Sequence, residues 1–318
     1  MSFSADNSLS VLIKQKAYDL GFDLCGIAPS KPLKEREKIL IDWCSSGMNG
    51  EMTYLAKNID KRIDPQFLVP DAKSLIVTGL SYYTDIKQSE PGVPVISRYA
   101  YGANYHDVIK GKLYKLLAFI KSLKAETEGR PFADTGPLLE KAWASEAGLG
   151  WQGKHSIVIN KKIGSFFFIG ALIINIELDY DKPVKKKFCG NCRLCIDLCP
   201  TGAINENSTI DARKCIANLT IENREAIPEE LIPKIGGRIY GCDKCQEVCP
   251  WNKNAKSHNT PEFNISPELQ NLTRNEWLSL SQDRFSELFI NSVIERARYG
   301  DFMRNLKTIL RENDSEGS

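Results

Sequence analysis

The chain has 318 residues, long enough for about two domains and a sizeable buried core. Hydrophobic residues make up 42% of it and charged residues 26%, which excludes a wholly disordered or a fibrous protein. The formal net charge of +2 provides no overall attraction to nucleic acid or to an anionic membrane, so any site for a polyanion must be local.

Apolar periodicity predicts a mixed α/β region over residues 1–180. We expect helices over 8–20, 33–46, 106–126 and 137–147, and extended segments over 24–28, 74–83, 131–133, 156–159 and 165–176. The composition changes abruptly at residues 179–187, as at a domain boundary. A cysteine-rich domain over 181–258 and short helices over 259–318 are expected to follow.

Two features of the chain predict its compartment. The longest apolar run, Phe166 to Ile176, falls short of the roughly 20 residues that a membrane span needs. Residues 1–12 contain neither a secretory nor a twin-arginine signal. We therefore expect a cytoplasmic protein with no membrane association, in which the ten cysteines are not joined as disulfides.

Eight of the cysteines lie between residues 189 and 249. The first four spell C-x2-C-x2-C-x3-C-P, the spacing with which bacterial ferredoxins hold 4Fe-4S clusters. Three thiolates of one tight loop reach three irons, whereas the fourth cysteine points away and, in two-cluster ferredoxins, binds the other cluster. This run consists of Cys189, Cys192, Cys195 and Cys199, followed by Pro200.

A second run repeats the same C-x3-C-P ending at Pro250, and its missing first cysteine is expected to be Cys215. Two zinc sites are the alternative, because C-x2-C pairs also bind zinc, but zinc does not require this ending in both halves. Cys25 and Cys44 are expected only to pack. The crossed assignment gives Cys189, Cys192, Cys195 and Cys249 to one cluster, and Cys199, Cys215, Cys242 and Cys245 to the other.

Two adjacent clusters conduct single electrons but perform no substrate chemistry without an open iron or a further cofactor. The motif therefore leaves two classes open. One is a reductase whose clusters feed a second redox cofactor, and the other is an electron-carrier module that docks to a partner enzyme. A carrier would hardly need so large an additional α/β region.

Four stretches of the chain together resemble the epoxyqueuosine reductases, cobalamin-dependent enzymes of queuosine synthesis in tRNA. The stretches are SRYAYGANYH (97–106), FADTGPLLEKAWA (132–144), AGLGWQGKHS (147–156) and CDKCQEVCPWN (242–252). The resemblance implies an α+β fold with a nitroreductase-like α/β cobalamin-binding domain, a two-cluster ferredoxin-like domain and short C-terminal helices. This architecture is similar to that of reductive dehalogenases.

The resemblance also implies the reaction: two electrons and two protons convert epoxyqueuosine to queuosine at the wobble position of tRNA, the last step of queuosine biosynthesis. It implies base-off cobalamin, two 4Fe-4S clusters and an unidentified low-potential electron donor, and we expect a monomer. The alternatives are an iron-sulfur electron-transfer protein and a corrinoid reductase acting on another substrate.

The resemblance implies that Asp134 is the proton donor, because it occupies the position of the family's catalytic aspartate. Its apolar sequence neighbours also suggest that it is buried, and burial would raise its pKa. Its alternative role is to cap the helix near Pro137, while Glu140 is expected to pair with a cation. The resemblance assigns cobalamin contacts to Lys57, Ser97, Arg98, Tyr101, His106, Asp134, Lys154, His155 and Ser156, and contacts near the clusters to Ala217, Arg224 and Asp243. Each polar one could instead be an ordinary surface, capping or buried hydrogen-bonded residue.

Binding of tRNA needs local positive charge, because phosphate contacts dominate such binding. No acid intervenes between Lys182 and Arg193, a span that includes Lys185, Lys186 and Lys187. This stretch is either a tRNA contact or a solvated face. A second candidate consists of Arg296, Arg298 and Arg304.

Overall fold

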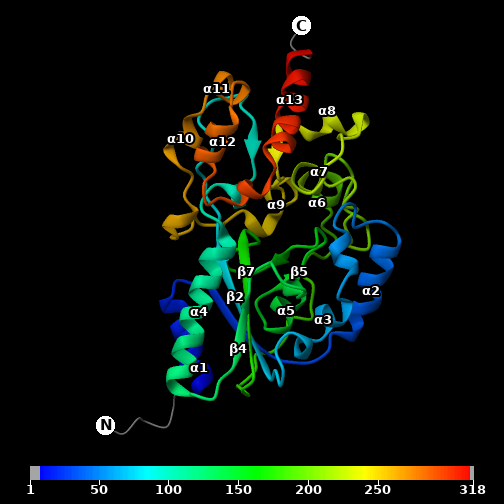
Figure 1. Ribbon diagram of the computed structural model, residues 1–318. Helices are drawn as coiled ribbons and strands as arrows, with labels where there is room; N and C mark the ends of the chain where they lie inside the picture. Colours follow the sequence, from blue (N-terminus) through cyan, green and yellow to red (C-terminus); the bar gives the residue numbers. More distant parts are fainter. Residues whose placement is uncertain (1–7, 316–318) are drawn as a thin grey trace.

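A computed structural model describes residues 8–315 and has an antiparallel four-stranded sheet at the centre of its larger lobe (Figure 1). The strand order is β1-β2-β7-β4. Every residue of β2 is buried, which explains why this strand reads as a continuous apolar run rather than an alternating one. The strands are β1 (Leu24–Pro29), β2 (Ser74–Ser81), β7 (Phe167–Ile174) and β4 (Gly129–Phe132).

Helices cover both faces of this sheet (Figure 1). On one face, α1 (Leu9–Asp19) and α4 (Tyr105–Leu123) pack over Ile76 and Leu172. On the other face, α5 (Glu140–Glu146) inserts Trp143 against Leu75 and Val77. Beyond it lie α2 (Lys34–Ser45) and α3 (Ile59–Ile63). Successive β2 residues therefore enter opposite cores, as the pleat requires.

The cysteine-rich part consists of short elements: α6 (Leu194–Asp197), α7 (Ile216–Ile221), α8 (Ile232–Ile235), β8 (Arg238–Tyr240) and α9 (Lys244–Glu247). β8 pairs in parallel with β3 (Val95–Ile96), so a segment from the first 180 residues completes this region. The hairpin of β5 (Trp151–Gln152) and β6 (Val158–Ile159) carries the glycine-rich turn. Gly150 is required there because a Cβ would lie 2.2 Å from the Ile159 carbonyl oxygen.

The C-terminal helices share a core with the cysteine-rich part. They are α10 (Pro267–Asn271), α11 (Arg274–Leu278), α12 (Gln282–Leu288) and α13 (Tyr299–Ser315). Asn305 of α13 is fully buried, and its amide donates to the carbonyl oxygens of Thr220 at 2.9 Å and Ile239 at 3.1 Å. Seven 3-10 turns complete the described chain: Thr53–Ala56, Pro65–Phe67, Arg98–Ala100, Glu229–Leu231, Pro250–Asn252, Pro261–Phe263 and Val293–Arg296.

The expected α+β fold is confirmed, with deviations at short elements. The helix expected over 137–147 begins only at Glu140, because Leu139 still has a non-helical backbone. The strand expected over 156–159 is confined to Val158–Ile159, because Ser156 has a positive φ of 62°. Residues 1–7, on which the expected absence of a signal partly rests, lie outside the described residues. Among described helices, none has the length and apolarity to cross a membrane.

Candidate active site and cluster-binding thiols

The loop between β4 and α5 presents Asp134. Its backbone has a φ of 55°, and this left-handed turn directs the side chain outward while Phe132 and Leu138 stay buried. The expected burial of Asp134 is therefore wrong, since its side chain is exposed. The alternative role as a helix cap is also wrong, because Leu139 occupies the cap position of α5 and no side chain caps that helix.

Two hydrogen bonds hold Asp134. The hydroxyl of Tyr105 donates to Asp134 Oδ2 at 2.5 Å, and the Asp134 backbone N–H donates to Glu140 Oε1 at 2.7 Å. Burial, followed by the charge of Asp134, raises the pKa of Tyr105 well above its usual value, so its phenol remains protonated and able to donate. Hydrogen bonds between its side chain and Tyr105 and between its backbone and Glu140 therefore fix the position of Asp134.

Glu140 supports the Asp134 loop, a role that sequence reasoning missed. Burial and the nearby charge of Asp134 raise its pKa to about 8. The expected cation partner is absent, since no ion pair among the described residues includes Glu140. A carboxyl that is largely neutral near neutral pH needs no counter-ion, and it can still accept the Asp134 N–H.

Stacked rings extend from the Asp134 site toward Cys245. The Tyr105 ring lies 4.1 Å from that of Phe168 with an interplanar angle of 4°, and Tyr82 lies 4.4 Å beyond Phe168. The Tyr82 hydroxyl lies 3.3 Å from Nε2 of Gln246, the residue that follows Cys245, so the stack ends beside the segment that carries this thiol. On the other side of Tyr105, His106 Nδ1 lies 2.8 Å from the Ala133 carbonyl oxygen. The long helix therefore delivers two side chains, Tyr105 and His106, to the same loop.

The structure brings Ser97, Arg98 and Asp243 together as one buried network. Asp243 accepts hydrogen bonds from the Ser97 hydroxyl, from the Arg98 backbone N–H at 2.9 Å and from Arg98 Nη1 at 3.0 Å. Arg98 Nη1 also contacts Glu247 at 2.9 Å. With Tyr101, these groups line a cavity of about 210 Å³. Because their polar atoms are largely occupied by one another, the network primarily joins the 97–101 segment to α9.

The hairpin turn places Lys154, His155 and Ser156 against the cysteine-rich part. Lys154 Nζ donates to the Cys192 carbonyl oxygen at 2.9 Å, and the Ser156 hydroxyl donates to that of Ser208 at 2.9 Å. His155 is 3% exposed, and burial lowers its pKa to about 4, so the ring is neutral. Its Nε2 is buried without a partner among the described protein atoms.

The remaining predicted contacts are less tightly held. Lys57 is exposed, and Ala217 is half-buried on α7 beside Asn218, whose Oδ1 is buried without a partner in the described part of the chain. Arg224 forms an ion pair with Asp301 at 2.9 Å. The structure therefore gathers most, but not all, of the proposed residues around the Asp134 loop and the cysteine-rich part.

The eight cysteine thiols between residues 189 and 249 fall into two sets, according to which thiols raise one another's pKa. The pKa of Cys195 is raised to about 11 by burial and then by Cys249, Cys189 and Cys192. The pKa of Cys245 is raised by burial and then chiefly by Cys215, Cys242 and Cys199. These neighbourhoods match the two sets of the crossed assignment. We call Cys189, Cys192, Cys195 and Cys249 the outer set, and Cys199, Cys215, Cys242 and Cys245 the inner set.

The donor chemistry of both sets fits iron-sulfur clusters. Buried thiolates repel one another, so the deprotonated sets require a cationic group between them. Within residues 8–315, no three His, Cys, Asp or Glu side chains converge as one metal ion requires. A cubic cluster has its ligands at separate corners, whereas a zinc ion gathers four thiolates at about 2.3 Å. Cys195 and Cys249 of the outer set are buried, whereas the other thiols of both sets are half-buried. Gly190 and Leu194, beside the outer set, are exposed.

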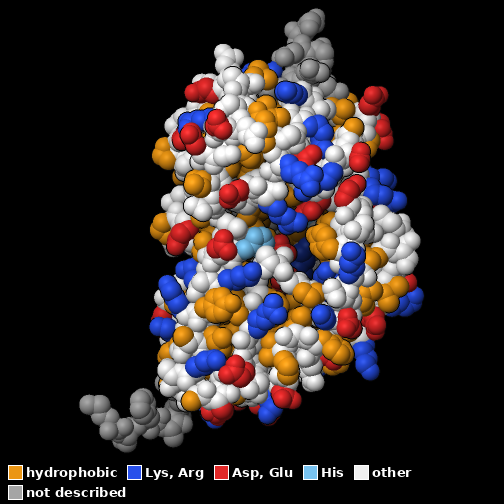
Figure 2. All heavy atoms as spheres, in the orientation of Figure 1, with side chains coloured by type: hydrophobic (Ala, Val, Ile, Leu, Met, Phe, Trp, Pro, Cys, Tyr) orange, Lys and Arg blue, Asp and Glu red, His pale blue; other side chains and the backbone are white. Residues whose placement is uncertain are grey.

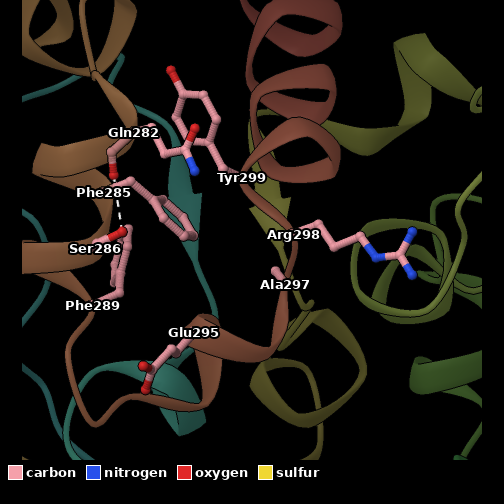
Figure 3. A pocket seen from close by; sticks show the side chains of 8 residues that line it. All are labelled: Gln282, Phe285, Ser286, Phe289, Glu295, Ala297, Arg298 and Tyr299. Atoms are coloured by element: carbon pink, nitrogen blue, oxygen red, sulfur yellow. Dashed lines mark hydrogen bonds between the residues drawn. The ribbon is translucent and has the colours of Figure 1, made fainter.

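The molecular surface is hollowed near the centre of the face in Figure 2, where histidine and basic side chains gather. A separate cavity of about 230 Å³ lies among the C-terminal helices. Its lining includes Phe285 and Phe289, whereas Arg298 points away from these rings (Figure 3). Of the three arginines proposed for tRNA, Arg296 instead pairs with Glu222 at 3.3 Å, and Arg304 donates to the Asn223 carbonyl oxygen at 3.0 Å.

Two thiol sets beside an antiparallel sheet, with a hydrogen-bonded acid at the edge of that sheet, define an iron-sulfur oxidoreductase. Residues 188–252 match the model of a 4Fe-4S double cluster binding domain, so the chain carries two such clusters. Residues 62–135 match the family model of epoxyqueuosine reductase QueG, DUF1730. An epoxyqueuosine reductase of Cellulophaga algicola is 46% identical over 297 residues, covering 93% of this chain and 96% of the relative. The chain therefore belongs to the epoxyqueuosine reductase family.

Solved structures of this family share the fold. An epoxyqueuosine reductase in complex with an epoxyqueuosine-modified tRNA-Tyr stem loop is 32% identical, with a TM-score of 0.87, and the match covers 94% of this chain and 80% of that one. The Bacillus subtilis enzyme, solved with its catalytic loop swung out of the active site, is 31% identical with a TM-score of 0.86 and the same coverage.

Proposed function

We propose that this protein reduces epoxyqueuosine to queuosine at the wobble position of tRNA, the last step of queuosine biosynthesis. The observation that carries this proposal is the Tyr105–Asp134–Glu140 array at the edge of the sheet, connected through Phe168, Tyr82 and Gln246 to the Cys245 segment of α9. An acid and an electron supply thus converge on one place. Family members with the same fold act on this substrate, and one is solved with the modified stem loop.

Asp134 is the proposed proton donor. Removal of an epoxide oxygen consumes two electrons and two protons and releases water, and the opened ring leaves an alkoxide that must be protonated. The exposed Asp134 carboxyl can approach such an oxygen, and the Tyr105 hydroxyl holds Asp134 Oδ2 in place through their 2.5 Å hydrogen bond. Glu140 keeps the loop in position by accepting the Asp134 N–H.

Base-off cobalamin is the proposed second cofactor, and it would supply a strongly reduced, nucleophilic cobalt for attack on the epoxide. The unpartnered buried atoms His155 Nε2 and Asn218 Oδ1 fit the amide-rich rim of a corrinoid. We propose contacts from Lys154, Ser156 and Ala217 near these atoms. The other proposed cobalamin contacts are not among the neighbours of these two atoms in the chain. They are Lys57, Ser97, Arg98, Tyr101, His106, Arg224 and Asp243.

The crossed ligation of the two clusters by the outer and inner sets is part of the proposal. Electrons enter at the outer set, beside which Gly190 and Leu194 are exposed, and reach the site through the inner set, whose Cys245 lies on α9 next to Gln246 and Tyr82. We further propose that the protein works as a monomer in the cytoplasm. One chain supplies all eight thiols and the acid, the substrate is tRNA, and the thiols need reducing conditions.

Nucleoside mass spectrometry tests the proposal directly. Epoxyqueuosine-containing tRNA is incubated anaerobically with reconstituted protein and a chemical reductant, with and without cobalamin. We expect the nucleoside to lose one oxygen only when cobalamin is present. If both clusters reduce normally but the nucleoside is unchanged, the tRNA assignment is wrong, and an electron carrier or a reductase for another substrate becomes the better interpretation.

A further inference from the structure

The lysines between residues 182 and 187 belong to the segment whose Val184 and Phe188 pack beside Cys189 and Cys249 of the outer thiol set. Lys182, Lys185, Lys186 and Lys187 are all exposed and directly precede Cys189 in the chain. No ion pair among residues 8–315 involves any of them. The outer set therefore lies beside a cluster of positive charges that the described part of the chain does not neutralise.

Aromatic packing attaches this charge to the outer set. Lys161 Nζ lies 3.9 Å from the centre of the Phe188 ring, and Lys186 Nζ lies 5.4 Å from it. Phe188 packs against Trp151 at 5.0 Å, within the small core that contains Cys249 and adjoins Cys189. Contacts of this kind hold a cation over the face of a ring. Lys161 and Lys186 are thus held against a ring that packs beside the outer set.

An apolar surface completes the patch. Helix α6 contains Cys195, and beside this ligand Leu194 is 42% exposed and Leu198 is 46% exposed. Arg193 pairs with two nearby acids, Asp197 at 3.1 Å and Glu206 at 2.6 Å. Exposed apolar side chains rimmed by charge are typical of surfaces that bind another protein.

The patch and the catalytic acid lie at opposite ends of α5. The Val184 N–H donates to the Ser145 carbonyl oxygen at 2.9 Å, near the last turn of α5, whereas Asp134 precedes its first turn. Positive charge beside the outer set, where electrons are proposed to enter, favours a partner that delivers electrons.

We propose that Lys182, Lys185, Lys186 and Lys187, with Leu194 and Leu198, form the docking surface for a small acidic protein that carries a low-potential flavin or iron-sulfur group. The inference rests on the proposed function for the role of the clusters. At each encounter the carrier's group loses one electron and the outer cluster gains it. Two encounters supply the two electrons that, with two protons, release the epoxide oxygen as water.

The test compares a protein donor with a small chemical donor. The holoenzyme variant Lys185→Glu/Lys187→Glu reverses two exposed charges, and Lys115→Glu/Lys124→Glu makes the same charge change at exposed positions in and just after α4. Reduction of the clusters is followed by stopped-flow visible absorbance, without tRNA, using reduced flavodoxin or dithionite-reduced methyl viologen. We expect flavodoxin to reduce the patch variant about tenfold more slowly than wild type, with a weaker salt dependence. The viologen rate and the control variant should match wild type.

Three results would overturn the inference. The flavodoxin rate could be unchanged, or both donors could slow equally, which would indicate a damaged cluster. In the viologen-driven assay, a raised KM for tRNA with an unaffected flavodoxin rate would identify the patch as a tRNA surface. Because cluster reduction is measured without tRNA, failure of the proposed epoxide reduction would leave this readout intact, so the two proposals fail separately.

Discussion

The sheet region and the cysteine-rich region are ordered by different forces. In the sheet region, β2 and β7 alternate side chains into two apolar cores that helices close on either side. In the cysteine-rich region, α6 and α9 have only four residues each, far too short to be stable by themselves. Apolar burial therefore stabilises the first region directly, whereas the second depends on the groups that its thiols bind and on packing against its neighbours.

The sheet region supplies the proposed proton donor, and the cysteine-rich region supplies the electron path. The variant with the largest expected effect should impair the first and leave the second intact. Asp134→Asn should lower turnover by about 10²- to 10⁴-fold, since the amide cannot deliver the proton. Reduction of both clusters should be unaffected, because Asp134 lies in the sheet region and contacts no thiol. Single-turnover nucleoside analysis and cluster absorbance measure the two effects. Wild-type turnover in this variant would remove Asp134 from the mechanism.

Removal of iron should affect the two regions unequally. We expect amide exchange in α6 and α9 to accelerate by roughly 10³-fold after anaerobic chelation, because the cluster ligation that ties these four-residue helices together is then lost. Exchange in β2 should change little, since its protection comes from buried apolar side chains. Hydrogen-exchange mass spectrometry of the holo and chelated proteins measures both. Equal loss in the two regions would contradict the conclusion that different forces order them.

The Arg98–Asp243 ion pair joins the two regions, so breaking it should destabilise both. Arg98→Met leaves the buried Asp243 carboxylate with only neutral donors, and we expect a loss of about 3 kcal/mol in the free energy of unfolding. Arg284→Met is the control, because Arg284 is 47% exposed and its ion pairs should contribute less than about 1 kcal/mol. Urea unfolding of both holo variants gives the comparison, and similar losses would show that burial is not decisive.

The smallest effect concerns His155, at the contact between the regions. Burial lowers its pKa to about 4, so below about pH 6.5 the unfolded chain binds a proton that the folded protein rejects. Stability is therefore lost as the pH falls from about 6.5 towards 4. Between about pH 7.5 and 5.5, wild type should lose about 1 kcal/mol more than His155→Gln. Urea titrations at the two pH values measure this, and identical losses would mean that the ring is not held neutral.

Much of the molecule could be read from local sequence patterns. The strands over 74–83 and 165–176 and the helix over 106–126 are long and strongly patterned, and the structure confirms them as β2, β7 and α4. The cysteine spacing alone led to the two-cluster interpretation, because a cluster in a tight loop imposes its own spacing on the chain. The short elements β3, β5 and α3 were not predicted, since two to five residues carry too little periodicity.

Only the tertiary structure decided how the acids are used. Sequence placed Asp134 among apolar neighbours and suggested burial, but a positive φ turns its side chain outward. Glu140 was expected to pair with a cation, and instead accepts the N–H of Asp134. Likewise, no local pattern joins Val95–Ile96 to Arg238–Tyr240 or Arg98 to Asp243. Local periodicity and motif spacing determine elements and ligand sets, whereas the direction of a side chain and its partner depend on which distant segments the core brings together.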